Sequence, residues 1–199
     1  MPRVMKRLRT FALAFISAVL LASQAGAARA HDHHESTTSL TAPAISATAK
    51  YRSLVVTKKA GYSILADSAG ITCIAEPQMG AMGVHYVKAD LVKDPMIDPA
   101  HPEALVYAPD RHGGLHLAAL EYVVIKSDWE AGQTQPPNMG YPTAVTPGPP
   151  MLFGHMFNFT GAPNRYGLPP FYSLHAWIWK ENPAGTFAMW NSSVHCDET

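Results

Sequence analysis

The first thirty residues combine a basic head with an apolar run. The run covers residues 11–22, and four basic residues without any acid precede it: Arg3, Lys6, Arg7 and Arg9. Small residues follow it and end at Ala28-Arg29-Ala30. This order is typical of a secretory signal peptide, and the run is shorter than the roughly 20 apolar residues that span a bilayer. We therefore expect residues 1–30 to be removed. The remaining protein would be exported, periplasmic or extracellular, and would have no stable membrane anchor.

A polar segment and then a helical stripe follow. Residues 31–42 are rich in His, Ser and Thr, which predicts a flexible arm. Helical spacing then places five residues on one stripe: Ala47, Tyr51, Leu54, Val55 and Lys58. Thr41 suits the N-cap, Pro43 the first turn and Gly61 the position after the last turn. The pattern predicts one helix between Thr41 and Gly61.

From residue 82 onward the pattern changes to short runs rich in Val, Leu, Ile, Tyr and Trp. Such runs predict strands, here over residues 82–88, 103–108, 115–125 and 171–180. Asp110 to Gly114 has the Asp and Gly chemistry of a hairpin turn, so the second and third strands should pair antiparallel.

Residues 127–170 contain nine prolines and six glycines and show no periodic pattern. Their aromatic and Met content indicates an ordered segment, since such side chains seek burial. The predicted fold is α+β. An N-terminal helix packs on an antiparallel sheet of about four strands, and a long Pro/Gly-rich loop wraps around them. Residues 43–199 would form a single globular domain.

The net charge argues against one class of partner, and the two cysteines indicate a cellular compartment. The chain has 15 Lys and Arg against 15 Asp and Glu. Five of the basic residues and no acid lie in residues 1–30, so the remainder has a net charge of about −5 with His neutral. Nucleic acid is therefore a poor partner, because its binding needs clustered Lys and Arg. Cys73 and Cys196 are expected to form a disulfide in an oxidising compartment. Service as two thiolate metal ligands is the alternative.

One carboxylate stands out on the strand 115–125. Alternation places Glu121 on the face with Leu115, Leu117 and Val123, which is the more apolar one, so its charge needs a partner. His85 and His175 lie in the middle of two other predicted strands. Two imidazoles and a carboxylate suit Fe(II), Mn(II) or Zn(II) with open positions for water or substrate. His155 could add a fourth ligand or act as a lid residue. In the competing interpretation the same residues form a satisfied polar core.

A second, separate metal site depends on where the signal peptide is cut. Cleavage after Ala30 exposes an amino terminus reading His31-Asp32-His33-His34. The free amine, backbone nitrogens and His33 imidazole could then hold Cu(II) or Ni(II), or His31 could chelate through its own amine and ring. Cleavage after Ala27 would remove this motif. A solvated tail with incidental metal binding is the other interpretation.

Several segments resemble a family of small uncharacterised bacterial exported proteins. The resemblance covers roughly residues 48–196 and is carried by segments that include Met82 to Val87, Leu120 to Val124 and Leu174 to Gly185. Asn191-Ser192 stands where an Asn-Pro pair is expected. The resemblance implies export but no activity, cofactor or fold.

Two functions are therefore expected. The first is an exported domain that binds a divalent transition metal (Fe, Mn, Zn or Cu), with enzymatic use of the metal left open. The alternative is a non-catalytic ligand-binding or structural module of the periplasm or the secreted fraction. The sequence identifies neither a small-molecule nor a protein partner.

Overall fold

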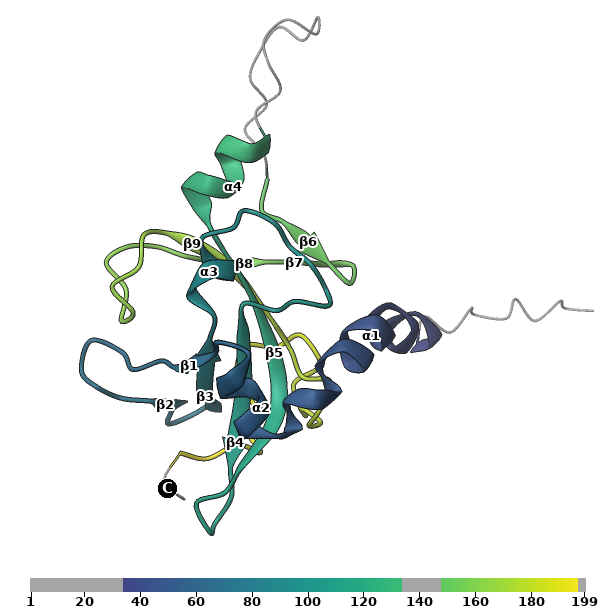
Figure 1. The fold of residues 1–199 in the computed structure, drawn as a ribbon, viewed down its shortest axis with the longest axis vertical. Coiled ribbons are helices and arrows are strands. Elements are labelled where there is room, and N and C mark those ends of the chain that lie inside the picture. The colour runs from purple at the N-terminus through teal and green to yellow at the C-terminus, as the bar shows by residue number, and fades with distance from the viewer. Residues whose placement is uncertain (1–33, 134–147, 197–199) are drawn as a thin grey trace, which may run out of the picture. The chain divides into compact units, whose positions relative to one another are not determined.

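A computed structural model describes residues 34–133 and 148–196 of the chain. Its main element is a seven-stranded sheet in which every pairing is antiparallel (Figure 1). The order is β1-β3-β4-β5-β9-β8, and β2 also pairs with β3. The strand bounds are β1 Ser63–Ile64, β2 Cys73–Glu76, β3 Gly80–Val87, β4 Ala104–Pro109, β5 Leu115–Ile125, β8 Asn158–Thr160 and β9 Phe171–Ala176. A separate hairpin joins β6 Met151–Leu152 to β7 His155–Met156.

The helical residues form a broken rod instead of the single helix expected. α1 His34–Thr48 is followed by the 3-10 turn η1 Ala49–Arg52 and by α2 Leu54–Lys59. α1 begins well before Thr41, so residues 34–42 are helical and Pro43 lies inside the helix. The 3-10 turn changes the helical phase, which leaves Val55 exposed while Ala44, Thr48 and Tyr51 are buried. Two short helices, α3 Ala89–Val92 and α4 Lys126–Gln133, follow strands β3 and β5.

The larger hydrophobic core lies on one face of the sheet. It buries side chains from four central strands, among them Tyr86, Leu105, Leu120, Tyr122 and Leu174. The broken helical rod and the hairpin β6–β7 cover this face, contributing Ala44, Tyr51 and Phe153. In Figure 1 α1 lies on one side of the long strand β5, whereas β1 and the β8–β9 connection lie on the other. The opposite face carries a smaller buried cluster that includes Val106, Ala119 and Trp177.

A bulge in β5 corrects the face assignment of its amino-terminal half. Tyr107 pairs with Leu117, but Leu105 pairs with Leu120, so the alternation shifts by one residue between them. Leu115 and Leu117 consequently pack into the core on the helical side, and Glu121 lies on the opposite face with Ala119 and Val123. The apolar face of β5 is therefore not the face that carries Glu121.

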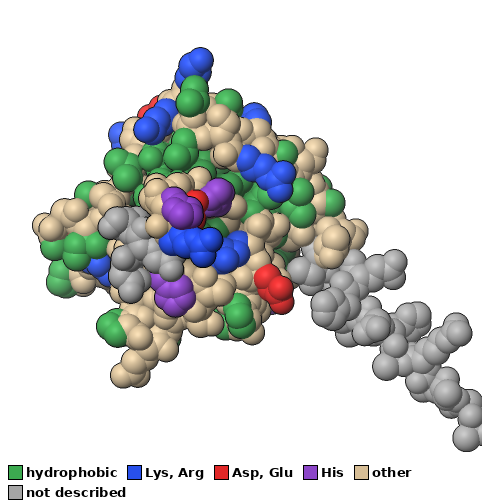
Figure 2. Space-filling model, turned by 90° about the horizontal axis from the view of Figure 1, so that it is seen from below, with side chains coloured by type: hydrophobic (Ala, Val, Ile, Leu, Met, Phe, Trp, Pro, Cys, Tyr) green, Lys and Arg blue, Asp and Glu red, His purple; other side chains and the backbone are tan. Residues whose placement is uncertain are grey.

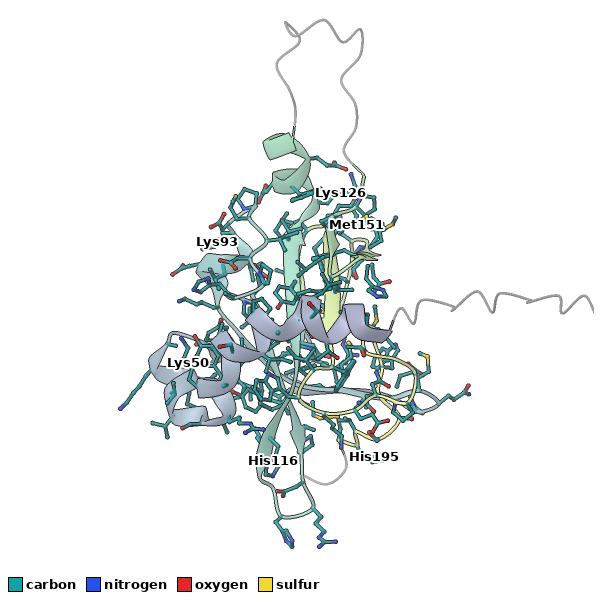
Figure 3. All side chains as sticks on the ribbon, turned by 90° about the vertical axis from the view of Figure 1, so that its right-hand side faces the viewer. Lys50, Lys93, His116, Lys126, Met151 and His195 are labelled. Carbon is teal, nitrogen blue, oxygen red and sulfur yellow. A yellow bond between two sulfur atoms is a disulfide. The ribbon has the colours of Figure 1, made fainter. Side chains whose placement is uncertain are left out.

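The sheet has about seven strands where we predicted four. The four predicted strands are present as β3, β4, β5 and β9, and the predicted bounds 115–125 are those of β5. The additional strands β1, β2 and β8 have only two to four residues each, too few to show an alternating pattern. The segment predicted to wrap contains α4, the β6–β7 hairpin and β8. Figure 3 shows β5 running from the hairpin turn near His116 to Lys126, where α4 begins.

The predicted disulfide is confirmed. Cys73 in β2 is bonded to Cys196, with their Cα atoms 5.6 Å apart. Within residues 34–133 and 148–196, no helix has the length and apolar character needed to cross a membrane.

Candidate metal centre

Three strands that are distant in sequence bring the candidate ligands to the second face. Glu121 in β5 lies directly opposite His175 in β9. His85 lies in β3, which is separated from β5 by β4. In the intervening strand β4, Ala104 pairs with Glu121 and Val106 pairs with His85. Because β3 and β5 are about 10 Å apart across β4, their long side chains can meet only above short residues, and Ala104 provides that space.

The ligand atoms of the three residues converge. His85 Nε2 lies 3.4 Å from Glu121 Oε2 and 3.5 Å from His175 Nε2. His175 Nδ1 lies 3.8 Å from Glu121 Oε1. The ligand atoms that the three side chains offer all lie within 4.8 Å of one another. Two ligands bound to one metal at about 2.0–2.2 Å lie roughly 3.0–3.6 Å apart. The two separations from His85 Nε2 lie in this range, and the set would have to contract slightly around a shared ion.

Burial controls the charge of the three groups. His85 and His175 are only 2% and 1% exposed. Burial lowers the pKa of each imidazole to about 4, with Glu121 opposing the effect at His85. Burial also raises the pKa of Glu121, while His85 and the Ser173 hydroxyl oppose the increase. At neutral pH both imidazoles are therefore uncharged, which is the form that binds a metal.

Two ring nitrogens in this cluster are unpaired. Within the described part of the chain, the buried Nδ1 atoms of His85 and His175 have no hydrogen-bond partner. An unpaired buried polar atom costs about 1–3 kcal/mol. The His85 nitrogen that faces the other two side chains is Nε2, so its Nδ1 does not point to a shared ligand. His175 Nδ1 lies 3.8 Å from Glu121 Oε1, so an ion beside Glu121 would give this atom a partner.

A cavity of about 570 Å³ reaches two members of the cluster, while His175 is not among its lining residues. His85 and Glu121 both line it, and the side chain of Glu121 is 13% exposed. The walls are mostly apolar and come from β1, β3, β5, α3 and the β8–β9 connection. His85 and Glu121 would thus present a bound metal beside a mostly apolar space.

An ion pair holds the β8–β9 connection over this cavity. Arg165 donates two hydrogen bonds to Asp67 Oδ2, at 3.0 and 2.7 Å. The backbone N–H of Ser68 also donates to the Arg165 carbonyl. The next residue, Tyr166, lines the cavity, and its ring contacts Phe171. The β1–β2 and β8–β9 connections are thus joined beside the pocket.

The remaining predicted ligands lie elsewhere. His155 is exposed in β7, where its ring packs on Phe187 with centroids 4.0 Å apart, and it is not one of the three converging residues. His31 and His33 lie outside the described residues, as does the predicted signal peptide. Figure 2 shows histidine, acidic and basic side chains close together on the face seen from below. At the β4–β5 turn, His116 bonds Asp110 at 2.7 Å.

Sequence reasoning placed neither Ser173 nor Tyr166 beside Glu121 and did not predict the burial of Glu103. Ser173 lies two residues before His175, so strand alternation could have placed both on one face with Glu121. Tyr166 belongs to an irregular segment, which offers no such pattern. Glu103 is a fully buried carboxyl group next to a strand that reads as uniformly apolar. Only the tertiary structure brings Tyr166 to the pocket and buries Glu103.

Comparisons with protein-family models, with curated proteins and with solved structures find no match to this chain.

Proposed function

We propose that this chain is an exported protein that binds a divalent transition metal through His85, Glu121 and His175. The observation that carries the proposal is the convergence of two neutral, buried imidazoles and one carboxylate whose atoms are spaced for a shared ion. Such a donor set suits Fe(II), Mn(II), Zn(II) or Cu(II), and a three-residue set leaves coordination positions open.

Open positions beside an apolar cavity favour metal-dependent chemistry over simple storage. A divalent metal supplies Lewis acidity and lowers the pKa of bound water. The chain would contribute orientation and exclusion of bulk water, with Ser173 holding the Glu121 carboxylate through a hydrogen bond. His155 and the His31/His33 chelate remain separate predictions that the core site does not require.

A second candidate is a non-catalytic module that binds a small molecule in the same cavity. The pocket volume, within the 300–1,000 Å³ range of ligand sites, favours it. In that case the Glu121 carboxyl group would interact only with the neutral His85 ring and the Ser173 hydroxyl, and no metal would be bound.

Export is supported by two features. The basic and apolar pattern of residues 1–30 is that of a secretory signal, and a disulfide between Cys73 and Cys196 is stable in an oxidising compartment. We propose a periplasmic or extracellular location.

Elemental analysis of untagged protein purified from the exported fraction tests the proposal. We expect near-stoichiometric metal in the wild type and in His155→Ala, whose exposed side chain lies in a different element. Glu121→Gln should weaken metal binding by about 100-fold or more, because loss of even an outer partner costs about 10–100-fold. His175→Ala should behave in the same way.

Circular dichroism and a thiol assay on each variant establish that the fold and disulfide are intact. The intact mass of the wild type shows whether the chain begins at Ala28 or His31. A wild type that neither carries metal nor takes up Zn(II), Mn(II), Fe(II) or Cu(II) would refute metal binding and favour the second candidate. Metal that disappears only when residues 31–34 are deleted would move the site to the amino terminus.

A further inference from the structure

The cavity above the metal cluster has a distinct division of polarity. Its walls include Ile64, Val87, Val92, Val123, Ile125 and Phe171, all apolar. Most of a ligand that fills this space would therefore contact hydrocarbon. The polar groups deep in the sheet are His85 and Glu121, so the ligand's polar end should lie at this base.

The charge at the base determines which polar end would fit. Imidazole binds a metal in its uncharged form, so a divalent cation held by His85, His175 and the Glu121 carboxylate would give this site a net charge of +1. In a cavity with few polar groups, such a charge is costly unless a bound anion balances it. Lys93 and Asp128 also line the cavity, but both are exposed and carry opposite charges, so the rim adds no net charge.

We propose that the pocket binds a monocarboxylate with an apolar body, its carboxylate on the metal at His85, Glu121 and His175 and its hydrocarbon part between Val123, Phe171 and Tyr166. This inference rests on the proposed metal site and adds the class of ligand. One anionic oxygen group completes both the coordination and the charge, and the apolar body displaces water from the walls.

The metal also determines whether the pocket prefers an acid to an alcohol of the same chain length. Without the metal, a carboxylate entering the cavity would find Glu121 and no cation, so nothing at this end would attract its charge. An uncharged alcohol of the same chain length lacks this dependence on charge. Metal loading should therefore favour the acid specifically, whereas burial of hydrocarbon alone would favour both ligands equally.

Calorimetric titration of the full mature protein with octanoate and with 1-octanol measures this difference. We expect octanoate to bind the Zn(II)-loaded protein at least about 10-fold more tightly than the metal-free protein, and 1-octanol to change by less than about twofold. Ala89→Trp, at an exposed residue that lines the cavity, should weaken both ligands. Ala184→Trp, at an exposed residue outside the lining, should leave both unchanged.

Lys93→Gln separates the base of the pocket from its rim. We expect this variant to retain the metal-dependent preference for octanoate. Binding that is independent of metal and lost in Lys93→Gln would place the carboxylate at the rim and overturn the inference. Zn(II) uptake without a preference for octanoate would refute the ligand class and leave the metal site standing. A protein that takes up no Zn(II) under these conditions would refute both.

Discussion

Glu103 is a buried carboxyl group outside the His85–Glu121–His175 cluster. It is 1% exposed, and its Oε2 accepts a hydrogen bond from the Val123 N–H at 2.9 Å. β4 begins at Ala104, which pairs with Glu121, so Val123 lies beyond the paired part of β5. The Glu103 side chain therefore accepts the hydrogen bond that a longer β4 would have accepted from the Val123 N–H. Burial raises the pKa of Glu103 to about 8. The carboxyl group therefore carries a proton over much of the neutral range.

A carboxyl group whose pKa is higher in the folded state favours folding while it is protonated. This contribution to the free energy of unfolding is lost as the pH rises and the folded-state group ionises. The contribution of Glu103 should be fully present below its ordinary pKa of 4.5 and be lost as the pH passes through about 8. Glu103→Gln keeps a hydrogen-bond acceptor without the charge. We expect the wild type to lose on the order of a few kcal/mol relative to this variant between pH 5 and pH 9. Urea unfolding at a series of pH values measures the difference. Parallel pH profiles for the two proteins would contradict the prediction.

Gly83 allows β3 to form a bulge and to lie close to β4, two residues before His85. Gly83 has φ +99°, and a Cβ added there would lie 2.6 Å from the Tyr107 carbonyl oxygen in β4. The pairing of β2 with β3 also changes register between Ile74, opposite Gly83, and Ala75, opposite Ala81. A side chain at this bulge would push β3 away from β4 two residues before His85.

Gly113 offers a matched comparison, because it also has a positive φ, +77°, but its added Cβ would meet nothing within 4 Å. Gly113→Ala should cost about 1–2 kcal/mol from backbone strain alone. Gly83→Ala should cost about 3 kcal/mol or more, since strain and a backbone clash combine. It should also reduce metal content, whereas Gly113→Ala should not. Unfolding curves and elemental analysis measure the two effects, and equal losses of stability in both variants would show that the clash is absorbed.

At the scale of the whole molecule, the carboxyl-terminal segment closes the second face of the sheet. Asn191 exchanges two backbone hydrogen bonds with Ala81 in β3. Val194 is buried, and the Trp177 ring stacks beside His175 with centroids 6.2 Å apart. The Cys73–Cys196 bond then joins the end of this segment to β2 across 123 residues. The disulfide thus secures the segment whose Val194 packs in one buried cluster with Trp177, the ring next to His175.

Replacing both cysteines by serine should lower the free energy of unfolding by about 4 kcal/mol, because a loop of this length is constrained in the unfolded chain. Guanidinium unfolding of the double variant measures the loss. Wild-type protein treated with a reductant is the control and should lose a similar amount. A double variant as stable as the oxidised wild type would show that native contacts alone hold the segment.

Features encoded by local pattern could be predicted from the sequence alone. The long strand Leu115–Ile125 and the turn from Asp110 to Gly114 follow from residue type and alternation over many positions. The Cys73–Cys196 bond follows from a count of two cysteines. His85, Glu121 and His175 stood out because polar groups in apolar strands need partners.

Only the tertiary structure decided how these pieces combine. Whether the three candidates meet depends on strand order, on register, and on small Ala104 between β3 and β5, all of which are non-local. The short strands β1, β2 and β8 exist because long neighbours pair with them, and their own residues carry no periodic signal. The cavity over the cluster, with Tyr166 held beside the Arg165–Asp67 pair, arises from contacts between segments about 100 residues apart. Such long-range contacts leave no pattern in a single sequence.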